Sequence, residues 1–191
     1  MWVQYELLPH LRFIEELSDT VVTFIIPSFR VRWHRYVAPA SMLSGMSLQQ
    51  FMSVDNFFNF YTSTQKEEFL HQFLACLYLR PRRAFFGKNL VDIEGEAAFL
   101  SRLDPVTSIA IYVNWILIKN WLSRTFRHLF ASGSDIAIAG KNKGTDWLEV
   151  FDSFVGDHVA DMESYQRMEC MDAFRIMNNK IKDSKINKRY G

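Results

Sequence analysis

The sequence predicts a mainly α-helical protein, in which a helical bundle-like domain follows a short N-terminal β-hairpin. Hydrophobic residues make up 49% of the 191 residues, and over most of the chain they recur every three or four positions, as on one face of a helix. Helix-start signals precede two of these runs, at Ser47 and at Asp104. Alternating β-branched and aromatic residues, which are typical of strands, occur before residue 40. We therefore expect an N-terminal helix and hairpin over 1–45 and a helical domain over 46–191.

The first forty residues predict one short helix and the hairpin. The stretch PHLRFIEEL, over 9–17, opens on a proline and places its apolar residues at helical spacing. Two runs rich in β-branched and aromatic residues, VVTFII and FRVRWHRYV, then flank Pro27 and Ser28. In the second run apolar residues alternate with Arg30, Arg32 and His34, which is the period of a strand. We expect these two runs to form the short hairpin.

Residues 47–80 predict two helices that pair as an αα-hairpin. Ser47 and Gln50 have the spacing of a capping box, in which a hydroxyl and an amide satisfy free backbone N–H groups at a helix start. Thr64 and Glu67 repeat that spacing. The second helix is expected to end near residue 79, because a proline follows at once and cannot continue it. The two helices should join at 62–64.

Capping residues and glycines predict the remaining elements. A short acidic helix is expected over 94–102, and Asp104–Pro105 then opens the longest helix, which should run to about residue 130. Its most apolar run, IAIYVNWILI, falls well short of the roughly 20 residues that cross a bilayer, so we interpret it as a central buried helix. A glycine-rich loop over 131–145, a short helix over 147–155 and a final helix from about residue 157 complete the chain.

Charge and cysteine content limit the classes of function. The formal net charge of +1 creates no overall field that would attract nucleic acid or an anionic membrane. Cys76 and Cys170 belong to no ligand cluster and occupy apolar helical positions, so we expect buried free thiols in a reducing cytoplasm. The N-terminus has neither a basic region nor a long apolar region, so we expect no secretory signal.

No catalytic signature is complete in the sequence. Gly140–Lys141 resembles the end of a phosphate-binding loop, but an aspartate replaces the first glycine of that motif. Glu68 and His71 have the E-x-x-H spacing of metal ligands, and a site completed by His158 and Asp161 is one hypothesis. A solvated glutamate and a half-buried histidine are the simpler interpretation. We therefore predict no enzymatic activity and no cofactor.

A basic and aromatic stretch suggests nucleic-acid binding as the alternative function. Arg30, Arg32 and Arg35 alternate with Trp33 and other rings, so guanidinium groups could hold phosphates while the rings stack on bases. Lysines in the C-terminal tail would add nonspecific attraction. The charged outer face of a hairpin explains the same pattern without a ligand. No helix-turn-helix or zinc pattern supports nucleic-acid binding, which therefore ranks second.

The stretch SLQQFMSVDNFFNFY, over 47–61, carries the candidate partner-binding residues. On a helix, Phe51, Val54 and Phe58 form a stripe that should face the core. The opposite, polar face is expected to hold Asp55, Asn56 and Asn59. The stretch has more rings than this stripe needs, so a partner would have to cover the remainder. The predicted partner-binding residues are Phe57, Phe60 and Tyr61.

A series of packing and capping residues runs through 25–81. These residues are Ile26, Pro27, Pro39, Leu43, Ser47, Leu48, Gln50, Phe51, Phe73, Leu77, Tyr78 and Pro81. Together with the Trp, helix break and long final helix of 147–185, they make the chain similar to uncharacterised proteins encoded among the tail genes of Bacteroidetes phages and prophages. That family has an I-x-I-P-like opening, a helix starting near [ST]-[LF]-x-[QE]-F and a helix ending L-x-x-x-L-Y-R-P. This chain departs from the pattern at Leu79, which separates the Tyr from the Arg.

The resemblance implies a non-enzymatic role in tail morphogenesis. The chain would be an assembly chaperone that shields the tape-measure protein, or a minor tail component. A helical protein that exposes aromatic and methionine side chains can cover the apolar stripe of a long partner helix. The resemblance places the protein in the bacterial host cytoplasm during assembly, with retention in the virion and self-association into a homo-oligomer as further options. No membrane association is expected.

Overall fold

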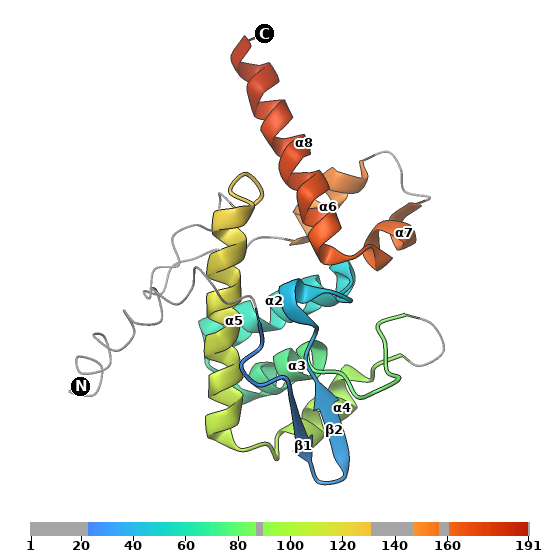
Figure 1. Ribbon diagram of the computed structural model, residues 1–191, viewed down its shortest axis with the longest axis vertical. Helices are drawn as coiled ribbons and strands as arrows, with labels where there is room; N and C mark the ends of the chain where they lie inside the picture. The colour runs from blue at the N-terminus through green and yellow to red at the C-terminus, as the bar shows by residue number, and fades with distance from the viewer. Residues whose placement is uncertain (1–22, 87–89, 131–146, 157–160, 191) are drawn as a thin grey trace, which may run out of the picture.

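The computed structural model describes residues 23–86, 90–130, 147–156 and 161–190, and it is mainly helical with a short β-hairpin (Figure 1). The predicted fold class is therefore confirmed. The helix expected over 9–17 and the loop expected over 131–145 lie outside the described residues. Each helix in the described ranges falls short of the length or the apolar character that a membrane span requires.

The β-hairpin consists of β1 (Ser28–Val31) and β2 (His34–Val37), which pair antiparallel around the two turn residues Arg32 and Trp33. The predicted pairing was wrong, because both strands come from the single run FRVRWHRYV. The segment before Pro27 bonds to a helix instead. The amide side chain of Asn114 accepts from the Ile25 N–H at 3.0 Å and donates to the Thr23 carbonyl at 3.3 Å.

The helix pair predicted over 47–80 is confirmed as α2 (Leu48–Thr64) and α3 (Glu67–Leu77), which lie side by side (Figure 1). Ser47 caps α2 by accepting a hydrogen bond from the Gln50 N–H at 3.1 Å. The second half of the capping box does not form, because the Gln50 amide donates to the Cys76 carbonyl of α3 at 2.9 Å. That buried bond joins the two helices directly.

The second predicted capping box, at Thr64 and Glu67, was wrong. Thr64 is the last residue of α2, and its hydroxyl donates to the Phe60 carbonyl at 2.7 Å within that helix. Gln65 then reverses the chain in a left-handed conformation with φ of 56°, so the helices join at 65–66 and not at 62–64 as expected. The side chain of Lys66, which precedes α3, makes no capping hydrogen bond.

Removing the cap at the start of α2 should destabilise the protein. We expect Ser47→Ala to lower the free energy of unfolding by about 1 kcal/mol, because one N–H of the first turn loses its acceptor. Ser53→Ala is the matched control: its hydroxyl bonds back to the Gln49 carbonyl inside the helix, where alanine is at least as favourable. Urea unfolding of both variants measures the difference, and equal stability of the two would contradict the capping role.

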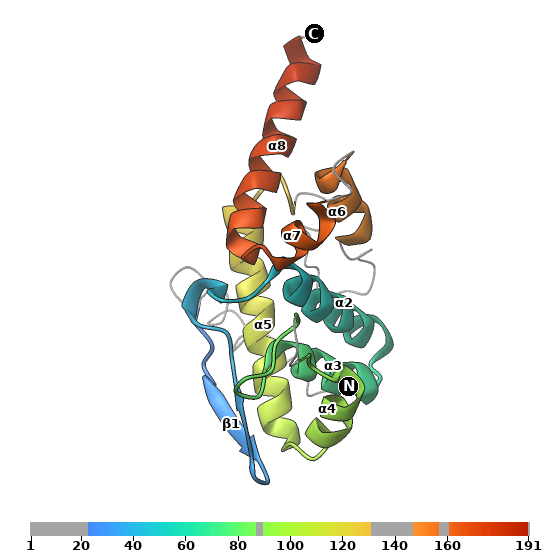
Figure 2. The ribbon, with the colours of Figure 1, turned by 90° about the vertical axis from the view of Figure 1, so that its right-hand side faces the viewer.

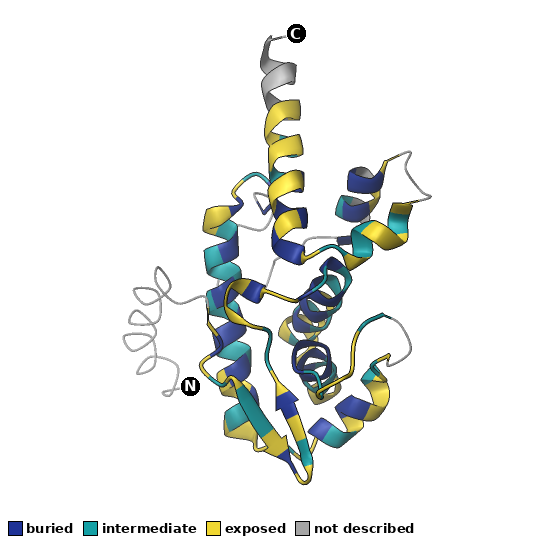
Figure 3. Cartoon of the chain, turned by 45° about the vertical axis from the view of Figure 1, so that its right-hand side comes forward, coloured by how far each residue is buried: buried dark blue, intermediate teal, exposed yellow. Residues whose placement is uncertain are grey.

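The longest internal helix, α5 (Pro105–Thr125), follows α4 (Ile93–Leu100). Asp104 caps it as predicted, by accepting from the Thr107 N–H at 2.9 Å. The helix ends five residues earlier than expected. It is not buried on all sides, because Ile111, Trp115 and Ile118 face the core while Val106 is 76% exposed. Figure 3 shows exposed residues at the N-terminal end of α5.

The C-terminal part contains α6 (Trp147–Val155), α7 (Met162–Arg167) and α8 (Cys170–Tyr190). The helix α6 matches its prediction, and Gly156 follows it with a positive φ of 56°. The single final helix was wrong, because the chain breaks at Met168 and Glu169. There the Met168 carbonyl accepts a hydrogen bond from the Leu48 N–H at 2.8 Å, and the Cys170 N–H donates to the Met46 carbonyl at 2.9 Å. These bonds replace the helical ones and leave α8 pointing away from the hairpin end (Figures 1 and 2).

One hydrophobic core joins the hairpin and the helices. Its centre is an aromatic cluster around Phe51, whose ring centroid lies 5.7 Å from Trp115, 5.2 Å from Trp147 and 4.7 Å from Phe174. The four rings come from α2, α5, α6 and α8. Near the hairpin a second set of rings packs together, formed by Phe24, Phe29, Tyr36 and Tyr78.

Candidate functional site

The two cysteines are buried, as predicted, and they are chemically quiet. Burial raises the pKa of Cys76 and of Cys170 to about 12, so both thiols stay protonated at neutral pH. A thiolate is the form that attacks an electrophile or binds a metal. The thiol groups therefore act as small apolar side chains of the core.

A buried polar network fixes the hairpin to the helices. The Tyr36 hydroxyl donates to Glu96 Oε2 at 2.6 Å, and the Arg80 guanidinium donates to the same oxygen from two nitrogens at 2.7 Å. Burial, with the hydrogen bond to Glu96 as a smaller cause, raises the pKa of Tyr36 to about 12. The Arg80 guanidinium is thus engaged inside the protein, where its side chain is 23% exposed. The network positions β2 against the end of α3 and against α4.

Loss of the shared carboxylate should loosen the hairpin. We expect Glu96→Ala to lower the free energy of unfolding by about 2 to 3 kcal/mol, because a buried hydroxyl and a guanidinium lose their acceptor together. Glu94→Ala, an exposed position of the same helix, should change stability by less than about 0.5 kcal/mol. Urea denaturation measures the free energy of unfolding of both variants. A loss at Glu96 no larger than that at Glu94 would show that the network does not stabilise the fold.

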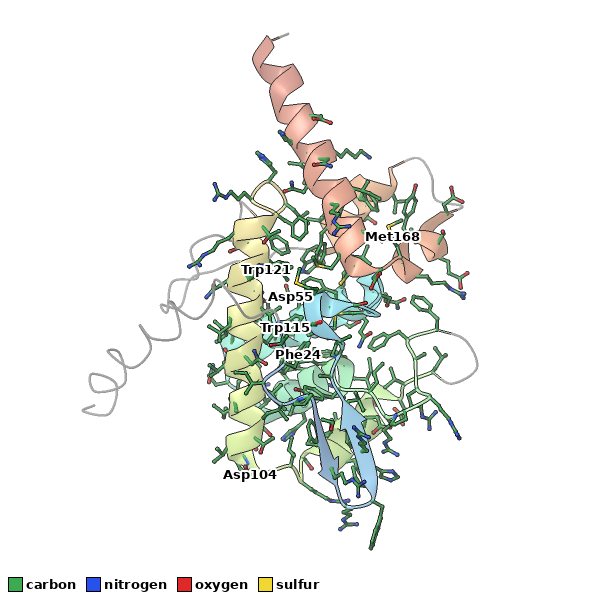
Figure 4. All side chains as sticks on the ribbon, viewed as in Figure 1. Phe24, Asp55, Asp104, Trp115, Trp121 and Met168 are labelled. Atoms are coloured by element: carbon green, nitrogen blue, oxygen red, sulfur yellow. The ribbon has the colours of Figure 1, made fainter. Side chains whose placement is uncertain are left out.

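A second buried network lies at the centre of the molecule, around Asp55 (Figure 4). Although Asp55 was expected on a polar outer face, it is only 1% exposed. Its Oδ2 accepts from Trp147 Nε1 at 2.7 Å, and its Oδ1 has no directed hydrogen bond but lies 2.6 Å from the Lys119 ammonium group. Lys119 also sits 4.6 Å above the Phe58 ring. The network ties α2 to α5 and α6.

The hypothetical metal ligands are only partly placed by the structure. Glu68 is exposed, and His71 is half-buried with a pKa lowered by that burial. Asp161 is exposed just before α7, and His158 lies outside the described residues. Within the described ranges, no three His, Cys, Asp or Glu side chains gather closely enough to hold a metal ion.

An apolar surface, here called the apolar edge, lies where the junction of α2 and α3 meets the first half of α5. Phe60, 43% exposed, packs on Phe69 with ring centroids 5.2 Å apart. Tyr61 contacts Tyr112 of α5 edge to face at 5.1 Å. Ile109 and Val106 precede Tyr112 in the same i±3 row of side chains, which runs towards the start of α5. The apolar edge consists of Phe60, Tyr61, Phe69, Val106, Ile109 and Tyr112.

Two of the three predicted partner-binding residues lie on the apolar edge. Phe60 and Tyr61 belong to it, whereas Phe57 is half-buried and packs against the core. Ile109 was missed because the run IAIYVNWILI, which it begins, was interpreted as a central buried helix, and Val106 was missed because it precedes that run. The signal was present in the sequence: the run has more apolar residues than one buried face of a helix can use.

The predicted nucleic-acid residues gather at the end of the β-hairpin. Arg30 and Arg35 are direct register partners on its exposed face. Arg32 and Trp33 form the turn, and the Trp33 side chain is 93% exposed. The alternation predicted that Trp33 lies within a strand, but the structure places it in the tight turn between β1 and β2. We call these four residues the hairpin tip.

Comparisons with protein-family models, with curated proteins and with solved structures find no match to this chain. The surfaces themselves therefore carry the functional inference. Of the two, the apolar edge draws on three helices, and the hairpin tip on a single turn and its flanking strands.

Proposed function

We propose that this protein is a non-enzymatic assembly or structural protein of a phage-like tail, which binds an apolar helix of another protein through its apolar edge. The observation that carries the proposal is the exposure of three large apolar side chains on α2 and α5, with Phe60 43%, Ile109 43% and Val106 76% exposed. The assignment to a tail, with a tape-measure protein as partner in the host cytoplasm, rests on the resemblance of the sequence alone.

The shape and chemistry of the apolar edge suit a helix as the ligand. Val106, Ile109 and Tyr112 recur every third residue of α5 and form an inclined row of apolar side chains, against which a helix crossing α5 at an angle can pack. The Phe60–Phe69 ring pair adds a broad apolar surface at the side. Aromatic side chains are enriched among the residues that dominate binding energy in protein interfaces.

The hydrogen bonding of Tyr112 also favours binding by the apolar edge. The Tyr112 hydroxyl lies 3.0 Å from the Thr62 hydroxyl, which itself donates to the Phe58 carbonyl at 2.8 Å. Tyr112 therefore has a fixed position between α2 and α5. A surface whose rings are already ordered loses little conformational entropy when a partner covers it.

Co-purification with a long helical protein tests the proposal. We would express the chain together with a tail protein of the tape-measure type from the same gene cluster and measure the affinity of the complex. Phe60→Ser combined with Ile109→Ser should weaken binding by at least about tenfold, because two exposed anchors are lost. Ile176→Ser is the matched control, since Ile176 is 47% exposed on α8, away from this surface. Binding that the double variant leaves unchanged would contradict the proposal, as would no binding by the wild type.

A further inference from the structure

We propose that the hairpin tip binds single-stranded nucleic acid, with Trp33 stacking on a base while Arg30, Arg32 and Arg35 hold the phosphates. This activity is separate from the protein-binding function proposed above, because it uses none of the residues of the apolar edge. The site is formed by β1, β2 and the turn between them, at the end of the molecule opposite the tip of α8 (Figures 1 and 2).

The first observation is the position of the Trp33 ring. At 93% exposure it is the most exposed of the large hydrophobic side chains that the structure describes. Within the described residues, its ring packs on no other aromatic ring. Tryptophan is normally among the most buried side chains on average. An indole ring held out into solvent with free faces is what base stacking requires, and such stacking tolerates any base.

The second observation is uncompensated positive charge around that ring. Arg30 and Arg35 stand directly opposite each other on the exposed face of the hairpin, where two like charges destabilise the pairing of the strands. Among the residues that the structure describes, the side chains of Arg30 and Arg32 have neither an ion-pair partner nor a hydrogen-bond partner. Arg35 makes one exposed bond, to the Ser28 hydroxyl at 3.4 Å. An anion between the opposed guanidinium groups would relieve their repulsion.

The third observation is the chemistry of the turn itself. Arg32 adopts a left-handed conformation with φ of 52°, where a two-residue hairpin turn favours asparagine or glycine. The chain instead places two large side chains, Arg32 and Trp33, in the turn. A local preference that the sequence breaks without a gain in packing is expected at a functional position.

These features favour a nucleic acid over other polyanions. Guanidinium groups pair with phosphates and also stack on bases, so all four side chains of the hairpin tip would contact one strand of nucleic acid. On a bilayer surface, the hairpin tip would bury only one indole ring. Interfacial membrane anchors usually bury a wider apolar face. An acidic protein would neutralise the arginines but would leave the indole without a stacking partner.

Fluorescence anisotropy with a labelled oligothymidylate, at several salt concentrations, tests the inference on the full chain. The wild type should bind at low salt. Trp33→Ala should weaken binding roughly tenfold, whereas Trp33→Phe, which keeps a ring, should retain most of it. Arg30→Gln with Arg35→Gln should lower the slope of log affinity against log salt by about 1.4, because each contact to a single strand contributes about 0.7.

Arg175→Gln is the matched control, because Arg175 is an exposed arginine of α8, outside the β-hairpin. It should bind like the wild type. Three results would overturn the inference: no binding by the wild type at low salt, equal binding by Trp33→Ala and the wild type, or full competition by polyglutamate or by phosphatidylserine vesicles. The last result would identify a general anion-binding surface instead. Because the co-purification experiment depends on other residues, either proposal can fail without the other.

Discussion

Replacing Asp55 with alanine should lower the free energy of unfolding by about 3 to 5 kcal/mol, as expected when one partner of a buried ion pair is removed. The change leaves the Lys119 ammonium group without its counterion, and it removes the acceptor of the Trp147 indole N–H. Both groups are largely buried, so water can replace the lost contacts only in part. Urea or guanidinium unfolding, followed by circular dichroism, measures the loss.

A double variant separates the charge from the packing. Asp55→Leu combined with Lys119→Met removes both charges and keeps apolar volume, so it should recover most of the stability that Asp55→Ala loses. Asn59, whose amide donates to Asp55 Oδ2 at 3.2 Å at the edge of the network, supplies the milder comparison. Asn59→Ala should cost about 1 kcal/mol. If Asp55→Ala lost no more than that, the network would not join the helices.

Phe51→Ala should be the second most damaging substitution, with a loss of about 3 to 5 kcal/mol. Phe51 is fully buried, and its ring contacts Trp115, Trp147 and Phe174. Alanine would leave a cavity where α2, α5, α6 and α8 meet. Rigid aromatic neighbours from four helices can collapse into that cavity only in part, and incomplete collapse raises the cost of a large-to-small substitution.

The control for Phe51 lies on the same helix. Phe60→Ala shortens an identical side chain at a position that is 43% exposed, so it should cost less than about 1 kcal/mol. Thermal unfolding monitored by near-ultraviolet circular dichroism would follow the aromatic cluster directly. A loss at Phe51 as small as that at Phe60 would mean that the cluster around Phe51 is not the centre of the core.

Local signals in the sequence were enough to predict most helices. Ser47 and Asp104 fixed two helix starts, because a side-chain oxygen at such a position bonds within its own first turn. The stripe of Phe51, Val54 and Phe58 was correctly assigned to the core, because its spacing alone determines the face that it shares. Predictions of this kind depend on neighbours a few residues away.

Errors occurred where contacts between distant residues decide the structure. The break at Met168 depends on backbone bonds to Met46 and Leu48, more than a hundred residues earlier in the chain. Asp55 has the polarity of a surface residue, and its burial depends on Lys119 and on Trp147. The spacing of apolar residues along a helix cannot reveal contacts with residues so distant in the sequence.

The two candidate surfaces were predictable to different extents. The residues of the hairpin tip were all named from the sequence, because basic and aromatic residues alternate within six positions. Their arrangement was not, since the turn at Arg32 and Trp33 carries no Asn-Gly signal. For the apolar edge, the rings of α2 were found, whereas the surplus of apolar residues in α5 did not show by itself that Val106 and Ile109 are the exposed ones.

Hydrogen–deuterium exchange of the complex with a helical tail protein tests the proposed function most directly. Binding through the apolar edge should slow the exchange of amides over 57–69 and over 105–116, because a covering partner suppresses local opening of those helices. The hairpin, over 28–37, should exchange as in the free protein. Slower exchange confined to the hairpin or to α8, with the apolar edge unchanged, would contradict the account.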